Sequence, residues 1–186
     1  MIKTSILLSS ILLLLTFSGC SSEEEQTQDI NSMVSKNEYV LTSTDNKQYV
    51  VTKEGKGFVL AGAKGKIVIF DIFATWCPPC RATATHLTSL QKKYKDDLVI
   101  IGITIEDNIA NEKLQEFAKE NNAKYILVNS TTNRTLADAI VMELGLGERY
   151  PIPTMAMYKD GKLINHFVGM TQEEFIESDI KKALGK

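Results

Sequence analysis

Two cysteines, Cys77 and Cys80, have a spacing that suits redox chemistry. They follow an apolar run, residues 67–74, and stand at the start of a helical pattern that covers about residues 78–94. Two thiols three positions apart at a strand-to-helix junction can close a small disulfide without moving the backbone. We expect Cys77 to cap the helix, where free amides and the helix dipole favour its thiolate. Cys80, one turn in, should be shielded and act as the resolving thiol.

The amino-acid composition excludes several classes of protein for this chain. Of 186 residues, 44% are hydrophobic and 24% are charged, which is typical of a globular chain and excludes wholesale disorder. Lys and Arg number 21 against 23 Asp and Glu, and the net charge of -2 without a basic stripe argues against a nucleic-acid partner. Three cysteines suit neither a disulfide-dense scaffold nor a four-ligand structural zinc site. We therefore predict no metal and no cofactor.

The third cysteine belongs to the N-terminal segment. Lys3 precedes an apolar run at residues 6–17 and small residues follow it, as in a secretory signal peptide. Residues 17–20, Phe-Ser-Gly-Cys, resemble a bacterial lipobox. We predict a lipoprotein signal peptide at 1–19, then a lipid anchor on Cys20 and a disordered tether, together residues 20–36, which place the protein in the cell envelope, facing the periplasm or the outer surface. The alternative is plain secretion with an incidental cysteine.

From residue 37 onward, strand-like and helix-like patterns alternate. The predicted strands cover residues 39–44, 48–52, 67–74, 98–105, 125–128, 154–158 and 163–168. The predicted helices cover about residues 78–94, 110–121, 134–144 and 172–184. This order predicts a single layered α/β domain over residues 37–186, with antiparallel hairpins at both ends.

Two segments resemble the signatures of the thioredoxin fold. They are residues 70–80, Phe-Asp-Ile-Phe-Ala-Thr-Trp-Cys-Pro-Pro-Cys, and residues 152–161, Ile-Pro-Thr-Met-Ala-Met-Tyr-Lys-Asp-Gly. The resemblance covers residues 37–186 and is nearest to the membrane-tethered TlpA/ResA group of extracytoplasmic thiol-disulfide oxidoreductases. It implies a thioredoxin-like α/β fold, with a central mixed sheet flanked by helices, an N-terminal hairpin and a strand-helix insertion within residues 110–144.

The resemblance also implies roles for particular residues. Pro153 matches the family's cis-proline beside the active disulfide, which leaves Ile152 free to pair with a client backbone. Trp76 matches the aromatic residue that covers the site. Asp71 matches a buried carboxylate beneath the second cysteine, whose pKa desolvation should raise so that it can exchange a proton with Cys80. The alternatives are an ordinary trans proline, a tryptophan that only fills the core, and an aspartate that points outward from an edge strand.

Two threonines depart from the pattern of the cytochrome-c-maturation branch, and a third replaces a residue that is usual in the family. Thr83 stands where that branch commonly has a glutamate, Thr154 follows the proline where its members can have another, and Thr85 replaces a helix-kinking proline. These departures leave the thiol chemistry intact and put a role in cytochrome c maturation in doubt.

We therefore predict an extracytoplasmic thiol-disulfide oxidoreductase that reduces disulfides of secreted client proteins through Cys77 and Cys80. A reductase in an oxidising compartment needs electrons from a membrane partner, here a transmembrane thiol carrier. The alternatives are a disulfide oxidase or isomerase with the same motif, a copper-binding assembly factor, and a redox-inactive module that binds clients.

Overall fold

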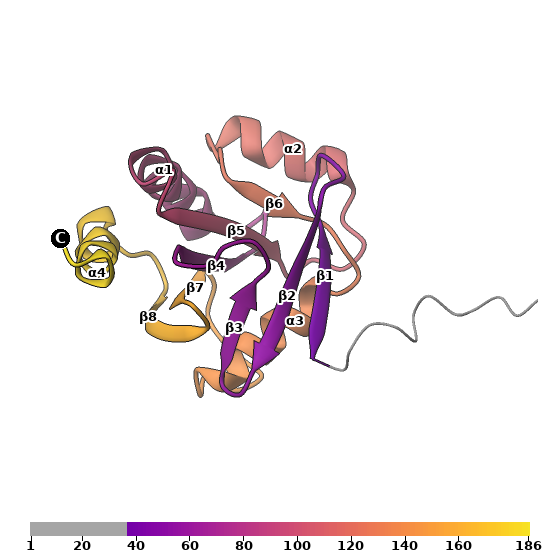
Figure 1. Ribbon diagram of the computed structural model, residues 1–186. Coiled ribbons are helices and arrows are strands. Elements are labelled where there is room, and N and C mark those ends of the chain that lie inside the picture. The colour runs from indigo at the N-terminus through magenta and orange to yellow at the C-terminus, as the bar shows by residue number, and fades with distance from the viewer. Residues whose placement is uncertain (1–36) are drawn as a thin grey trace, which may run out of the picture.

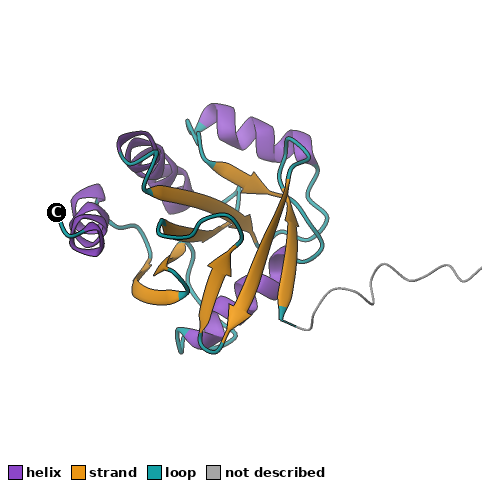
Figure 2. Ribbon diagram, viewed as in Figure 1, coloured by secondary structure: helices purple, strands orange, loops and turns teal. Residues whose placement is uncertain are grey.

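The computed structural model describes residues 37–186, so the predicted signal peptide, Cys20 and the tether lie outside the described residues. The described chain forms two sheets and four helices (Figures 1 and 2). No helix in this part of the chain is long and apolar enough to cross a membrane. In chain order, the elements are β1 (Glu38–Thr42), β2 (Gln48–Glu54), β3 (Gly57–Leu60), β4 (Ile67–Phe73), α1 (Pro78–Lys93), β5 (Leu98–Thr104), α2 (Asn111–Glu120), β6 (Ile126–Val128), α3 (Asn133–Glu143), β7 (Thr154–Lys159), β8 (Lys162–Val168) and α4 (Glu173–Leu184).

The larger sheet has the strand order β6-β5-β4-β7-β8. Strand β4 is central, pairing in parallel with β5 and antiparallel with β7. All seven of its residues are buried, because the sequence Ile-Val-Ile-Phe-Asp-Ile-Phe is apolar on both faces apart from one aspartate. The predicted mixed sheet flanked by helices is confirmed, and β4 points its carboxyl end at the two cysteines.

The two faces of this sheet are covered by different elements. On one face, Ile67 and Ile69 pack with Leu87 of α1 and Ile176 of α4. Side chains alternate along a strand, so Phe70 and its neighbours face the other way, where they pack against α3 and the N-terminal sheet. Figure 1 shows α1 and α4 on one side of the large sheet and α3 on the other. By the same alternation, Asp71 faces α1.

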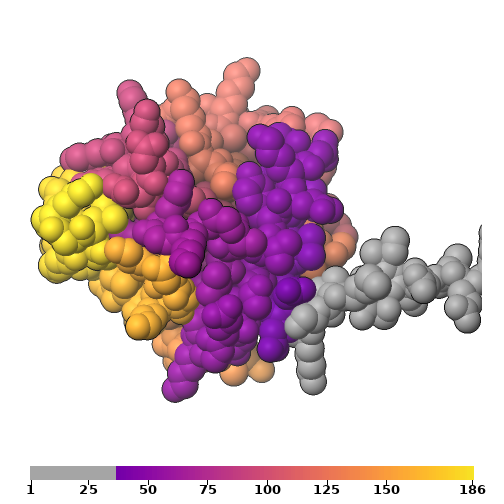
Figure 3. All heavy atoms as spheres, in the orientation of Figure 1, coloured from indigo at the N-terminus to yellow at the C-terminus, as the bar shows by residue number. Residues whose placement is uncertain are grey.

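The N-terminal hairpin has a third strand that the sequence reading missed. Strand β3 extends the predicted pair to the order β1-β2-β3, and its four residues are too few to show a clear alternation. It lies beside the β7–β8 hairpin, as the purple and orange surfaces of Figure 3 show. The approach is so close that a Cβ atom on Gly57 would lie 1.6 Å from the carbonyl oxygen of Gly161. Only glycine fits at position 57.

The predicted insertion region, residues 110–144, holds α2, β6 and α3. Strand β6 adds to the edge of the large sheet beside β5. It also meets the end of β1, because Asn129 N–H donates to the carbonyl of Thr42 and Thr44 N–H donates to that of Leu127. The short strand β6 thus links the two sheets.

Candidate active site

Cys77 occupies the N-cap of α1, as predicted. Its backbone is extended (φ -84°, ψ 112°), and the helix begins with two prolines at its first positions. Proline is well suited to the start of a helix because its φ is preset and no N–H is needed there. The Cys77 sulfur accepts a hydrogen bond from the N–H of Cys80 at 3.3 Å. The first residues of a helix usually provide several free N–H groups, but the two prolines provide none, so the Cys77 sulfur has a single amide donor.

Cys77 and Cys80 form a disulfide with a Cα–Cα distance of 5.3 Å. The prediction that Cys80 is shielded is confirmed, since the residue is 2% exposed. Cys77 is almost equally buried in this oxidised state, at 3%. The two residues therefore differ little in exposure, and both pack in one apolar cluster, but the Ile152 carbonyl lies beside the Cys77 sulfur.

The loop before β7 lies against the disulfide. The peptide bond between Ile152 and Pro153 is cis, as the resemblance implies. The carbonyl oxygen of Ile152 lies 3.7 Å from the Cys77 sulfur. Strand β7 begins only at Thr154, so Ile152 stands outside the strand ladder. The carbonyl of Pro153 accepts a hydrogen bond at 2.8 Å from Gly169 N–H, which ties this loop to the end of β8.

Asp71 is a buried carboxyl group in the central strand. It is 1% exposed, so the alternative of an outward-pointing edge residue is wrong. Burial raises the pKa of Asp71 to about 7, and a hydrogen bond at 3.2 Å from the Tyr125 hydroxyl to Oδ2 opposes that rise. Oδ1 has no hydrogen-bond partner within the described residues. A carboxyl group with a pKa near neutrality can both accept and return a proton at working pH.

Trp76 lies on the surface next to the cysteines. Its side chain is 62% exposed, so the alternative of core filling is wrong. The preceding residue, Thr75, is held by Glu106, whose carboxylate accepts hydrogen bonds from the Thr75 amide at 2.6 Å and from its hydroxyl at 3.0 Å. Arg81 donates to the Thr75 carbonyl at 3.0 Å. The loop that presents Trp76 and Cys77 is therefore fixed from both sides.

The structure thus brings five of the predicted site residues to one end of the sheet, and Asp71 lies in β4, the strand that leads to the cysteines. Sequence reasoning missed Glu106 and Tyr125, which contact the site from the loop after β5 and from the segment before β6. Glu106 could have been found in the sequence, because it is a carboxylate that closely follows a buried strand, in Ile105-Glu106-Asp107. Nothing in the sequence indicated Tyr125.

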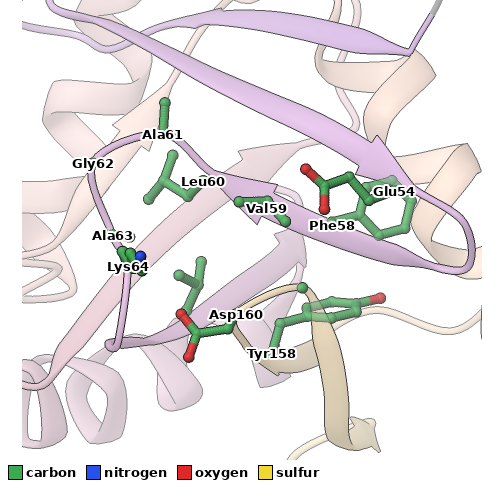
Figure 4. Close-up of a pocket in the computed structure, with 12 residues that line it drawn as sticks. Glu54, Phe58, Val59, Leu60, Ala61, Gly62, Ala63, Lys64, Tyr158 and Asp160 are labelled. Atoms are coloured by element: carbon green, nitrogen blue, oxygen red, sulfur yellow. The ribbon is translucent and has the colours of Figure 1, made fainter.

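A separate pocket lies at the opposite end of β4. Its volume is about 320 Å³, and Figure 4 shows it between the segment 58–64 and the residues Tyr158 and Asp160. Val68, near the start of β4, also lines it, whereas the cysteines follow the end of that strand. The pocket is therefore not part of the redox site. Within residues 37–186, no group of three or more His, Cys, Asp or Glu side chains could hold a metal ion.

The fold and the disulfide at the head of α1 define the class: this is a thioredoxin-fold thiol-disulfide oxidoreductase. The sequence comparison agrees, because the family model described as Redoxin matches residues 26–184. The chain belongs to the Redoxin family.

The chain is also similar to individual proteins of known name or structure. The thiol-disulfide oxidoreductase ResA of Bacillus thuringiensis (strain Al Hakam) is 29% identical over 136 residues, which cover 72% of this chain and 73% of the relative. A thiol:disulfide interchange protein of the thioredoxin family from Chlorobium tepidum TLS has a similar structure, with a TM-score of 0.62, 24% identity, and coverage of 80% of this chain and 94% of that one. A secreted Mycobacterium tuberculosis disulfide oxidoreductase, homologous to E. coli DsbE, gives a TM-score of 0.57 at 16% identity, covering 77% and 95%. These solved structures share the fold of this chain.

Proposed function

We propose that the protein reduces disulfides of client proteins outside the cytoplasm, with Cys77 as nucleophile and Cys80 as resolving thiol. In the first step, the Cys77 thiolate attacks a client disulfide, forms a mixed disulfide and releases one client sulfur as thiolate. In the second, the Cys80 thiolate attacks the Cys77 sulfur and expels the other client sulfur. The client gains two electrons, and the enzyme is left with the Cys77–Cys80 disulfide.

Asp71 handles the proton of the second step. Cys80 must lose its proton before it can attack, and it lies in an apolar environment that gives little access to water. A carboxylate on the adjacent strand, with a pKa of about 7, is an acceptor of matched strength. The charge balance is Cys80–SH plus Asp71–COO⁻ giving Cys80–S⁻ plus Asp71–COOH.

Client docking is assigned to Trp76 and to Ile152-Pro153. The exposed indole gives the client apolar surface beside the sulfur. The extended segment before β7 is outside the sheet ladder and lies 3.7 Å from Cys77 through the Ile152 carbonyl. A client strand that pairs with this segment would bring its disulfide next to the nucleophile.

The Cys77 sulfur accepts a hydrogen bond from a single amide. This observation supports reduction, rather than oxidation, as the direction of the reaction. The two residues between the cysteines are prolines, so only the Cys80 N–H remains to stabilise a Cys77 thiolate. A less stabilised thiolate makes the dithiol form a better electron donor.

The location and the electron supply follow from the N-terminal sequence. Residues 1–19 as a signal peptide and Cys20 as a lipid anchor would hold the domain at a membrane of the cell envelope, with residues 20–36 as the tether. A reductase there is recharged by a transmembrane carrier of thiol electrons. The M. tuberculosis disulfide oxidoreductase of similar fold is described as secreted, which agrees with the proposed extracytoplasmic location.

Trapping of the mixed disulfide tests the proposal. Cys80→Ser keeps the helix entry and removes the only thiol placed to resolve the intermediate, so this variant should accumulate covalent client adducts when expressed in its own envelope. The adducts should disappear on adding reductant. The matched variant is Cys77→Ser, which should accumulate far fewer because the Ile152 docking segment lies against Cys77 and Cys80 is one turn into α1.

The identity of the trapped proteins decides the finer function. A mixed set of clients supports general disulfide reduction, whereas haem-free cytochromes c would support the maturation role that Thr83 and Thr154 weaken. If Cys80→Ser gives no reductant-sensitive adducts while the wild type cycles between dithiol and disulfide, client reduction is refuted. Copper bound through both cysteines would then support the assembly-factor alternative.

A further inference from the structure

The layer between α1 and the large sheet holds a polar contact that the proposed mechanism does not explain. The Tyr125 hydroxyl donates to Asp71 Oδ2 at 3.2 Å, across 54 positions of the sequence. Tyr125 belongs to the segment just before β6, so its ring has to cross β5 to reach the central strand. Such a reach requires space that a neighbouring side chain would normally fill.

Gly102 supplies that space. It lies directly beside Asp71 in the parallel register of β4 and β5. A Cβ atom there would be 3.0 Å from Cε2 of Tyr125 and 2.7 Å from Cδ2 of Leu127, both closer than side-chain carbons normally approach. The missing side chain at position 102 thus lets the phenol ring lie over β5 with its hydroxyl at the carboxyl group.

Asp71 itself lies on the face of β4 that α1 covers. Phe73, two residues further along β4, packs in one cluster with Cys80. Ile69, two residues earlier, packs in another with Leu87. Asp71 lies between these clusters on the same face, and so faces the part of α1 that begins at Cys80.

Few polar groups lie in the surroundings of Asp71 Oδ1, the carboxyl oxygen without a hydrogen-bond partner. Within the described residues, only three buried side-chain N or O atoms lack a hydrogen-bond partner, and two of them are Asp71 Oδ1 and the Thr83 hydroxyl. Thr83 is one turn after Cys80 on the buried side of α1. On β5 and β7 the register neighbours of Asp71 are Gly102 and Met155, which do not titrate. Among the described residues, the ionisable side chains on the elements around Asp71 in this layer are therefore Tyr125 and the active-site cysteines.

We infer that Tyr125 is a positioning residue for the proton transfer from Cys80: its hydroxyl holds Asp71 Oδ2 and so turns Oδ1 toward α1. This inference rests on the proposed role of Asp71 as proton acceptor. The proton passes from the Cys80 thiol to Oδ1, the Cys80 thiolate attacks the Cys77 sulfur, and the client leaves as thiolate. Tyr125 gives up no proton, because burial and the neighbouring Asp71 raise its own pKa well above the usual value.

The hydrogen bond also sets the pH at which Asp71 becomes ionised. Burial favours the protonated carboxyl, and donation from Tyr125 favours the carboxylate. Without the donor, Asp71 stays protonated to a higher pH, so a smaller fraction of it is ionised and able to accept the Cys80 proton near neutrality. A hydrogen bond to a charged group corresponds to a shift of about one pH unit, which lowers the ionised fraction at pH 7 about fivefold.

The test is the pH profile of the resolution step in Tyr125→Phe, which removes one oxygen atom and keeps the ring. Reduced enzyme is mixed with a disulfide-bonded peptide, and decay of the mixed disulfide is followed by acid quench from pH 5.5 to 9.5. We expect the midpoint to rise by about one unit, with decay at pH 7 slowed about fivefold. The matched control is Tyr94→Phe, which removes a hydroxyl bonded to Glu177, away from the cysteines, and should leave the midpoint in place.

The variant Asp71→Asn distinguishes the proposed role of Asp71 as proton acceptor from the positioning role of Tyr125. If this variant keeps the parent's profile, Asp71 is not the acceptor and the proposed mechanism fails. If Asp71→Asn abolishes the midpoint but Tyr125→Phe leaves it unmoved, only the role of Tyr125 is refuted. In an Asp71→Asn background, Tyr125→Phe should cause no further change in the profile. A drop in stability without a shifted midpoint would mean that the tyrosine is merely structural.

Discussion

Replacing Asp71 by asparagine should stabilise the oxidised protein at pH 8, and the gain should fade toward pH 4. Burial raises the folded-state pKa of Asp71 to about 7 from the ordinary value of 3.8. Between these two values the unfolded chain has lost the proton while the folded chain keeps it. Folding stability due to this group is therefore fully present below pH 4, falls as pH rises, and is lowest above pH 7. Asparagine cannot ionise and does not suffer this loss.

The size of the effect follows from the two pKa values. They differ by about three units, and each unit corresponds to about 1.4 kcal/mol, so the relative stability of Asp71→Asn should change by about 4 kcal/mol between pH 4 and pH 8. Contacts of the new amide, including any with Tyr125, add an offset that does not depend on pH. The quantity to compare is therefore the change with pH in the stability difference between Asp71→Asn and the wild type, and not the stability difference at one pH.

Urea unfolding of both oxidised proteins at several pH values measures this quantity. Asp179→Asn is a control of opposite sign, because hydrogen bonds from Asn165 and Lys182 lower the pKa of Asp179. That variant should be less stable than the wild type at pH 8, with the deficit shrinking at low pH. A stability difference for Asp71→Asn that stays constant from pH 4 to pH 8 would refute the raised pKa of Asp71, and with it the proton acceptor in the resolution step.

Two further predictions concern the active-site loop. The Cys77–Cys80 couple should have a reduction potential near that of thioredoxin, about -270 mV, because the Cys77 sulfur accepts only the Cys80 amide; a value above about -180 mV in a redox-buffer titration would reverse the assigned direction. Glu106→Gln should weaken the two hydrogen bonds to Thr75, lowering the free energy of unfolding by about 1–3 kcal/mol and slowing mixed-disulfide formation. Unchanged unfolding and unchanged trapping rates in this variant would show that the carboxylate does not hold the loop.

Features that depend on neighbouring residues could be predicted from the sequence. The position of Cys77 as N-cap, the start of α1 at the prolines and the burial of β4 all follow from a local pattern of apolar residues, proline and cysteine. Asp71 could be placed in the interior because its neighbours on both sides are apolar.

Features that depend on tertiary contacts could not be predicted. The tyrosine that bonds Asp71 lies 54 positions away, and its reach depends on a glycine in a third segment, so no window of sequence contains the whole arrangement. The contact between Glu106 and Thr75 joins residues 31 positions apart for the same reason. Strand β3 was missed because four residues give no clear periodicity.

The strand order also has a consequence for how the protein is made. Strand β4 is central, yet its antiparallel partner β7 comes about 80 residues later in the chain, after β5 and β6. At about 5–20 residues per second, a ribosome adds that stretch in on the order of 10 s. During this time the apolar strand β4 lacks one of its two neighbours, so the large sheet cannot close before β7 has been made. A sheet that closes late leaves the chain incompletely folded during synthesis, which would suit the secretion that we propose.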